Sequence, residues 1–593
     1  MVLKLHKESK PRQVKQLFLP SVTLSEKQKR YIDKSKEALI YEVIYKNIDE
    51  SDYAILYDNE ANYKKVKSSN YEKLISSNKS LFLEDENNIE MIMRKRVRPV
   101  GRPNSSVRDL ITAIVLLNGN GWTHKDLFDN LRFNLLTRRA FGLYGLDENL
   151  FSEGTFYKFQ RRLLNHWVDT GVNLLELTFQ KLTSKMIEVL GLKTDIIRID
   201  SFQAMSNIAS YSRVRLVVEV LRRVFRIMSK EEQELHNELF SPYLKKSSSK
   251  YVYDLNSDEH VSSLETLAVV YEEVYNKLNE KYSSDSVFIK FTRVFNEHFI
   301  TNNDKFIPKD KKDLTSDMMQ SPDDEDATFR TKRGESFKGQ AVTVTETANP
   351  ENDINLVIDV STETNNTDDS NILASRIDSI KEQYEDVNEI HTDGAYGNEK
   401  NDKNLEKLGI SLIPTAIRGR NPKVKIIVSE TEVGDFTVEC PSQIVIANEG
   451  KKRYKALFNN NECERCPSFN QCKIRSTKKG RVLYFRKEQL KANIRNNKIM
   501  DIPKERQKLR PNVEATIKEY TKNMNHKGKF KVRGKFKIAL HATAMSISIN
   551  LGRIFRLLRK NGVSFAVFVQ LFLFLSIKHV FYAKKYHFAS VFS

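Results

Sequence analysis

Three acidic residues, far apart along the chain, stand where side chains can serve chemistry. Asp200 follows the apolar run of TDIIRIDS at residues 194–201, so we expect it to end a β-strand. Asp393 follows a second predicted strand and lies in the turn TDGAYG, whose two glycines free the backbone. An acid at the end of a strand points into the crevice where open α/β sheets bind ligands. Either aspartate, taken alone, could instead cap a turn or a helix.

The third acid, Glu514, lies in RPNVEATIKEYTKN, where Pro511 can begin a helix with a buried stripe. In that helix Glu514 can face a sheet edge, while Lys518, one turn on, projects toward a phosphate. Glu505 and Glu519 compete for the same role. A glutamate on a helix is most often a solvent-exposed residue without a function, and that alternative stays open.

The combination of Asp200, Asp393 and Glu514 suits metal-dependent phosphodiester chemistry. Cleaving or transferring a phosphodiester develops charge on both the attacking and the leaving oxygen, and two metal ions about 3.5–4 Å apart can stabilise both. Mg²⁺, or Mn²⁺ in its place, prefers hard oxygen ligands such as carboxylates. We therefore predict two such ions, held by the three acids if the fold brings them together.

All 4 cysteines of the chain lie between residues 440 and 472. They are Cys440, Cys463, Cys466 and Cys472, a set typical of a Cys₄ site for structural Zn²⁺, although the last spacing is wide. Such an ion would hold together a small insertion that we expect to have little apolar core. Four reduced cysteines without a metal are the alternative, whereas a disulfide scaffold does not suit a chain of this size.

The net charge of +20 favours a polyanionic partner, which could be nucleic acid or an acidic membrane surface. The excess is concentrated between residues 473 and 537, with 22 Lys or Arg against 5 Asp or Glu. A stripe of this kind can neutralise backbone phosphates, although a solvated basic face is the usual alternative. The predicted DNA-binding residues are Lys478, Lys479, Arg481, Lys518, Arg533 and Lys535.

The elements around the aspartates predict a mixed α/β sheet. The hydrophobic patterns indicate a hairpin, a helix, a strand, a helix and a strand, at 340–362, 370–384, 387–393, 398–408 and 410–416. Helical, charged sequence interrupts this core between the first strand and the hairpin.

The segment before the core is predicted to be helical. Ser106, Thr123 and Ser152 are expected caps of three successive helices, and Gly191 is expected to end a later one. Short helices separated by glycines suit a helix-turn-helix-like DNA-binding module, although packing or dimerisation is an equal alternative. Near the end of the chain, Val563–Ile577 is an apolar run of 15 residues, which is short for a membrane span.

Several motifs, in this order, resemble those of insertion-sequence DDE transposases. The strings are IRIDS, SPDDEDATF followed by KGQAVTV, TDGAYGN, and RPNVEATIKEY followed by KVRGKFKIALHATAMSISINLGRI. The segment RPVGRPNSSVRDLITAIVLL resembles the N-terminal domain often joined to that catalytic core. The resemblance covers residues from about 95 to 558. Its motifs are degenerate one by one and fairly specific in combination.

The resemblance implies an RNase H-like catalytic core with large insertions, preceded by an all-α N-terminal domain. In that family the first two acids are aspartates on strands, and the third is a glutamate on the helix after the last strand. Asp200, Asp393 and Glu514 match these positions, and related transposases also carry cysteines before the glutamate.

The expected organisation follows from these motifs. We predict an accessory extension (1–93), a helical DNA-binding or dimerisation domain (94–190), the catalytic core (191–558) and an apolar tail (559–593). A helical insertion (212–335) and a Cys-rich insertion (426–480) interrupt the core.

The activity implied is DNA transposition, in which strands are cleaved at the element ends and transferred into target DNA. The expected partners are the terminal inverted repeats and target DNA, bound by a homodimer, with no membrane. No signal peptide is visible, and a cytoplasmic, nucleoid-associated bacterial protein is expected.

Two other functions stay open. The long first segment and the Phe- and Val-rich tail depart from the family pattern, so an inactive or domesticated DNA-binding protein is one alternative. A related metal nuclease that cuts without joining is another. The chain has no GxSxG, Walker A or GxGxxG motif, so a serine hydrolase, an ATPase and a dinucleotide enzyme are unsupported.

Overall fold

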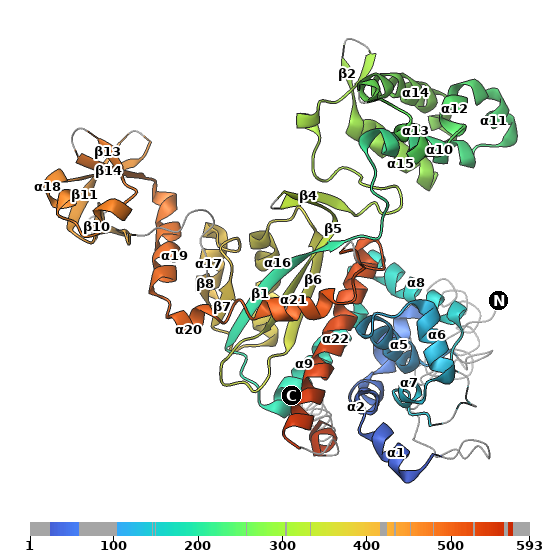
Figure 1. Cartoon of the computed structure of the whole chain (residues 1–593), viewed down its shortest axis with the longest axis horizontal. Helices are drawn as coiled ribbons and strands as arrows, with labels where there is room; N and C mark the ends of the chain where they lie inside the picture. Colours follow the sequence, from blue (N-terminus) through green and yellow to red (C-terminus); the bar gives the residue numbers. More distant parts are fainter. Residues whose placement is uncertain are drawn as a thin grey trace, which may run out of the picture. The chain divides into compact units, whose positions relative to one another are not determined.

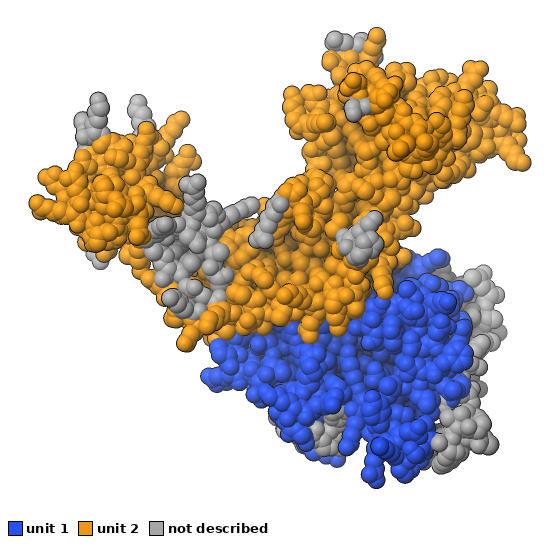
Figure 2. All heavy atoms as spheres, in the orientation of Figure 1, with its two compact units in different colours: residues 1–193, 346–359, 543–593 blue, residues 194–345, 360–542 orange. Residues whose placement is uncertain are grey.

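The computed structural model describes residues 24–57 and 104–572, except 145, 147, 149, 257, 303–304, 333, 415–423, 432–434, 451, 478–479, 526–527 and 563–566. The chain divides into two compact units (Figure 2). The first comprises residues 1–193, 346–359 and 543–593, and the second comprises residues 194–345 and 360–542.

The described N-terminal part of the first unit is helical. Its helices are α1 (Glu26–Asp33), α2 (Lys36–Val43), η1 (Tyr45–Asn47), η2 (Glu50–Leu56), α5 (Val107–Gly119), α6 (His124–Phe133), α7 (Leu135–Arg139), α8 (Glu153–Thr170) and α9 (Leu174–Leu190). The side chains of Ser106, Thr123 and Ser152 each accept a backbone N–H, which confirms them as the caps of α5, α6 and α8. Gly191 ends α9 in the left-handed conformation (φ 59°), as predicted.

The central sheet is mixed, which confirms the α/β class at this level. Its order is β4–β5–β1–β7–β8, and β6 also pairs with β5. The strands are β1 (Ile196–Met205), β4 (Thr328–Lys332), β5 (Glu335–Thr347), β6 (Val357–Thr364), β7 (Glu389–Thr392) and β8 (Ser411–Pro414). Strands β1, β7 and β8 are parallel neighbours. Helices α16 (Asp369–Gln383) and α17 (Glu399–Lys407) precede β7 and β8, so the predicted order of elements is confirmed.

One detail of this prediction was wrong, because Asp200 does not end its strand. Strand β1 runs on to Met205, five residues further. On its other side β1 pairs with β5, a strand of 13 residues, which can support β1 beyond the end of the short β7. Strand β1 pairs with β7 as far as Arg198 and His391. Asp200 therefore lies just beyond the edge where β7 stops.

Between β1 and β4 lies an insertion with its own core. Its helices are α10 (Arg213–Ile227), α11 (Lys230–Leu235), α12 (Asn237–Leu244), α13 (Ser248–Tyr253), α14 (Glu259–Tyr282) and α15 (Ser286–His298). Fully buried side chains such as Val217, Tyr271 and Phe291 fill the space between them. The hairpin of β2 (Phe299–Asn302) and β3 (Lys305–Pro308) and the turn η3 (Lys311–Asp313) complete the insertion.

The cysteines lie in a second insertion, built around a six-stranded antiparallel sheet of order β13–β14–β12–β11–β10–β9. Its elements are β9 (Ile427–Glu430), β10 (Phe436–Cys440), β11 (Gln443–Glu449), β12 (Tyr454–Phe458), α18 (Asn460–Glu464), η4 (Phe469–Gln471), β13 (Arg475–Thr477) and β14 (Gly480–Phe485). Our expectation of little apolar core was wrong. Phe436, Val438, Phe458 and Phe485 form a buried cluster, because alternate residues of the strands face inward.

Helices follow the second insertion. They are η5 (Lys487–Gln489), α19 (Leu490–Asp501), α20 (Lys504–Gln507), α21 (Val513–Thr521) and α22 (Lys535–Lys560). Helix α22 is the one described helix long and apolar enough to cross a membrane by length and composition. However, 89% of its most apolar window is buried inside the protein, as in a core helix. Of the apolar run at 563–577, only 567–572 is described, and its Phe568 and Phe572 are buried.

Candidate active site

Asp200 lies in β1, and Asp393 follows directly after the end of the neighbouring parallel strand β7. Ile196 is in register with Glu389, and Arg198 with His391, so two residues further along Asp200 comes level with Asp393. Successive side chains of a strand point to opposite faces of the sheet, and this alternation places the two aspartate side chains on the same face. Burial raises the pKa of Asp200, and the nearby charge of Asp393 adds to this increase, while Arg510 opposes it. The two carboxylates are therefore close enough to repel each other.

Arg510 connects this pair to the third acid. Its Nη2 donates to Asp200 Oδ2 at 2.6 Å, and its Nη1 donates to Glu514 Oε1 at 3.4 Å. Asp200 is nearly buried, whereas the side chain of Glu514 is 63% exposed. Arg510 therefore links two of the three predicted acids, and the third, Asp393, lies near enough to Asp200 to raise its pKa.

A row of polar contacts positions the segment that carries Arg510. Arg506 of α20 pairs with Glu389 of β7, and Arg198 of β1 donates to the carbonyl of Leu509 at 3.0 Å. By the same alternation, Glu389 and Arg198 point to the same face of the sheet as Asp393 and Asp200. The segment from Arg506 to Arg510 thus runs along one polar face of the sheet and ends at the acids.

Helix α21 then fixes the direction of Glu514. Val513 and Tyr520 are fully buried, and the ring of Tyr520 lies 5.7 Å from that of Phe202 in β1. Figure 1 shows α21 beside β1. The helix begins at Val513 and not at Pro511, with Asn512 as its N-cap residue. Glu514 consequently lies in the first turn, on the side facing Arg510.

The two competing glutamates are not part of this group. Glu505 is exposed on the short helix α20. Glu519 lies five residues after Glu514, which turns it about 140° around the helix. The contact with Arg510 therefore favours Glu514 among the three.

Three residues near the acids were not predicted from the sequence. Ser201 donates its Oγ to the buried Asp369 at 2.7 Å, and its backbone N–H to Asp200 Oδ1 at 2.9 Å. Burial raises the pKa of Tyr396 well above its usual range, and Asp369 and Asp200 raise it further. The phenol therefore lies among the acids. Asp369 is the first residue of α16, a few residues after β6, and this helix-start position was the signal available in the sequence.

His391, two residues before Asp393, is fully buried. Its Nε2 lies 2.6 Å from Glu389 Oε1. Burial alone would raise the pKa of Glu389. The hydrogen bonds with His391 and Arg506 outweigh this effect, so the pKa is lowered overall. His391 thus belongs to the contacts that hold the segment of Arg506.

The four cysteines face one small cavity in the second insertion. Cys440, Cys463, Cys466 and Cys472 line a space of about 20 Å³, together with Arg481 and others. Burial raises the pKa of the Cys463 thiol, Arg481 opposes the increase, and the other three cysteines add to it. Yet no group of three or more His, Cys, Asp or Glu side chains in the described residues is arranged as a metal site.

The predicted DNA-binding residues differ in their surroundings. Arg481 donates to the carbonyl of Cys472 at 3.2 Å and lies over the ring of Phe469. Lys535 pairs with Glu363 at 2.9 Å, and Arg533 lies 3.7 Å from Asp323. Lys518 is exposed on α21. Lys478 and Lys479 lie outside the described residues.

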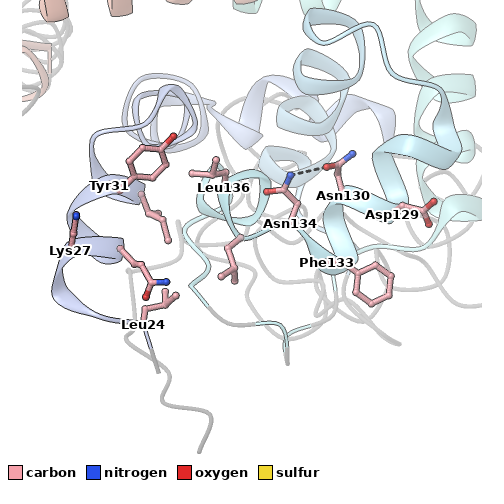
Figure 3. A pocket seen from close by; sticks show the side chains of 11 residues that line it. Leu24, Lys27, Tyr31, Asp129, Asn130, Phe133, Asn134 and Leu136 are labelled. Carbon is pink, nitrogen blue, oxygen red and sulfur yellow. Dashed lines mark hydrogen bonds between the residues drawn. The ribbon is translucent and has the colours of Figure 1, made fainter. Parts of the chain in front are cut away.

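The first unit contains a hollow of about 780 Å³ that is separate from the acids (Figure 3). It lies between α1, α6 and α7, with Leu24, Tyr31 and Phe133 among its lining residues. Asn130 and Asn134 on one wall hydrogen-bond each other at 2.8 Å. Its lining offers one acid, Asp129, and no set of carboxylates that resembles the group around Arg510.

Comparison with known families gives one match: residues 440–555 match the family model described as a transposase DDE domain. This segment is therefore similar to part of a transposase DDE domain. The resemblance to DDE transposases is thereby confirmed. The matched part of the domain contains all four cysteines, Arg510 and Glu514, and lies after Asp200 and Asp393. Comparisons with curated proteins and with solved structures found no match.

Proposed function

We propose that this chain is a DNA transposase that cleaves DNA strands at the element ends and transfers them into target DNA. The observation that carries the proposal is the convergence of three acids from distant segments. Asp200 lies in β1, Asp393 follows directly after the neighbouring β7, and Arg510 links Asp200 to Glu514 in the matched segment.

The chemistry of the donor set suits divalent metal ions, and the three side chains would have to move to ligand distances, because the described residues show no group already arranged to hold a metal. Carboxylate oxygens are the ligands that Mg²⁺ and Mn²⁺ prefer. Asp200 and Asp393 already repel each other, and a cationic group already lies between Asp200 and Glu514. Asp200, Asp393 and Glu514 would hold the ions, which stabilise charge on the attacking and leaving oxygens of a phosphodiester.

Other side chains position the three acids and contact the DNA. Ser201 orients Asp200 through its backbone N–H and links it to Asp369. Arg506 and Arg198 hold the backbone that presents Glu514. Lys518, exposed one turn after Glu514, can contact a DNA phosphate beside the acids. The same reasoning supports an RNase H-like core, since Asp200 lies in β1, Asp393 directly after the adjacent β7, and Glu514 on a helix after the last strand.

A structural Zn²⁺ in the Cys insertion is a second, separate part of the proposal. Four thiolates suit Zn²⁺, and the cavity that the cysteines share has room for one water-sized species. The thiols would have to move to ligand distances, because the described residues show no ready metal group. We also propose that the helical domain before the core and a homodimeric assembly take part in binding the DNA ends.

Asp393→Asn tests the catalytic proposal. The purified full chain is incubated with Mg²⁺ and DNA that carries the flanking ends of its reading frame, and cleaved and joined strands are separated. We expect wild type to form both products and Asp393→Asn to form neither while still binding the DNA. Cleavage that survives Asp393→Asn contradicts the assignment. Cleavage without joining in wild type identifies a nuclease, and binding without cleavage identifies an inactive DNA-binding protein.

A further inference from the structure

Arg510 occupies the position in the acid group where a bound cation would be expected. Asp200 Oδ1 already accepts the backbone N–H of Ser201, so Oδ2 is the oxygen left for a cation. Arg510 Nη2 takes this oxygen at 2.6 Å, while Nη1 reaches Glu514 at 3.4 Å. One positive side chain therefore neutralises parts of two of the three acids.

The guanidinium is not fully satisfied in this position. Arg510 is largely buried, with 17% of its side chain exposed, and its Nε is buried without a hydrogen-bond partner among the described residues. An arginine can donate five hydrogen bonds in a fixed fork, which matches a phosphate as well as a carboxylate. Glu514, its second partner, is mostly exposed, so the guanidinium lies at the edge of the acid group that solvent or DNA can reach.

We propose that Arg510 is an internal counter-ion that keeps divalent cations from the acid group until a DNA backbone phosphate takes over the guanidinium. This inference rests on the proposed function, since it concerns the loading of the same site. A metal ion on the oxygen that Arg510 holds would lie beside the guanidinium, and repulsion between the two positive charges disfavours metal binding while Arg510 stays in place. Metal binding and binding of the polyanion are then coupled, each favouring the other.

Removing Arg510 should change the affinity for metal ions in the opposite direction to the loss of a purely structural arginine. A neighbouring cation stabilises an ionised carboxylate by about 1–3 pK units, so removing it leaves the acids freer to bind another cation. We therefore expect Arg510→Gln to bind Mn²⁺ about tenfold more tightly in the absence of DNA. A residue needed only to hold the site together would, on removal, weaken the binding.

The experiment is a titration of the full-length protein with Mn²⁺, followed by electron paramagnetic resonance, with and without a short duplex DNA. Arg510→Lys keeps the charge and should keep the weak affinity of wild type. Arg506→Gln is the control for lost charge: it removes the same charge from the same segment, and because its contact with Glu389 positions that segment, its loss should leave Mn²⁺ binding unchanged or weaker, not tighter. DNA should tighten Mn²⁺ binding to wild type and have little effect on Arg510→Gln. Mn²⁺ bound by DNA alone is subtracted.

Asp393→Asn distinguishes a failure of the counter-ion inference from a failure of the proposed function. If Mn²⁺ binding depends on Asp393 but Arg510→Gln leaves it unchanged or weaker, the counter-ion inference is overturned and the proposed function stands. If Arg506→Gln tightens binding as much as Arg510→Gln, the effect is one of general charge and the inference is again overturned. If no Mn²⁺ binding depends on Asp393, the metal centre and the inference both fail.

Discussion

The acid group and the cysteine cavity are two candidate metal centres of the same chain, and they are assembled in opposite ways. The cysteines lie within 33 positions, at the end of β10 and in the segment between β12 and β13 of one insertion with its own apolar core. The acids come from residues 200, 393 and 514 and meet only because a strand register and a row of cross-segment contacts bring them together.

The two centres also differ in charge. The acid group holds repelling carboxylates and an internal arginine, whereas the cysteine cavity holds thiols with Arg481 beside them. A site that is costly to assemble and electrostatically strained is typical of function, and a local site with its own core is typical of a structural role. Changes in the acid group should therefore affect activity, and changes at the cysteines should affect stability.

The largest expected effect is on catalysis at Glu514. Glu514→Gln should lower cleavage by about two to three orders of magnitude, the usual cost of losing a group that stabilises transition-state charge. Glu519→Gln, on the same helix and with the same change of charge, should cleave like wild type. The measurement is the rate of strand cleavage in Mg²⁺. Equal losses in both variants would show that helix α21 is not aligned as the contact with Arg510 indicates.

The second effect concerns the cysteine insertion. Replacing Cys463 and Cys466 by serine should abolish bound zinc, measured by atomic absorption, and should make residues 427–485 sensitive to proteolysis. A structural Zn²⁺ contributes directly to folding free energy, although the apolar core of this insertion should preserve part of the fold. Zinc at less than one ion per chain in wild type would instead favour four reduced cysteines without a metal.

A smaller effect in the opposite direction is expected at Asp393. Asparagine keeps the oxygen that accepts the Ala395 N–H at 2.8 Å but removes the charge that repels Asp200. Asp393→Asn should therefore slightly raise the melting temperature in EDTA at neutral pH.

The pH dependence of that difference follows from Asp200. Its folded-state pKa is raised, so its charged form costs stability above that pKa, and the cost is lost as the pH falls through it. The difference in melting temperature between Asp393→Asn and wild type should thus shrink as the pH falls below neutral. A difference that stays constant with pH would contradict the repulsion between Asp200 and Asp393.

The last effect is expected at Ser201. Ser201→Ala removes the 2.7 Å hydrogen bond to the buried Asp369 and should lower the free energy of unfolding by about 1–3 kcal/mol. Denaturation in urea measures this loss. If Ser201 also orients Asp200, cleavage should fall with little change in DNA binding. Unchanged cleavage would limit Ser201 to a structural role.

Much of the local structure was predictable from the sequence. Serine and threonine caps, the glycine after α9, and the presence of strands β5 and β6 depend on neighbouring residues, and the structure confirms them. Burial does not alternate along these two strands, since β5 is buried throughout residues 339–347 and β6 throughout 357–362. The composition of the active-site motifs also pointed to Asp200, Asp393 and Glu514. The length of β1 was not predictable, because its last residues continue beyond the end of β7, along a strand more than a hundred residues away in the chain.

The sequence by itself determined which acids were available and what chemistry carboxylates can support. Only the tertiary structure decided that Asp369 and Tyr396 lie beside Asp200, that Glu519 does not, and that Arg510 links two of the acids. The physical reason is that helical and strand periodicity depend on adjacent residues, whereas strand register and cross-segment ion pairs depend on residues brought together by the packing of the whole sheet.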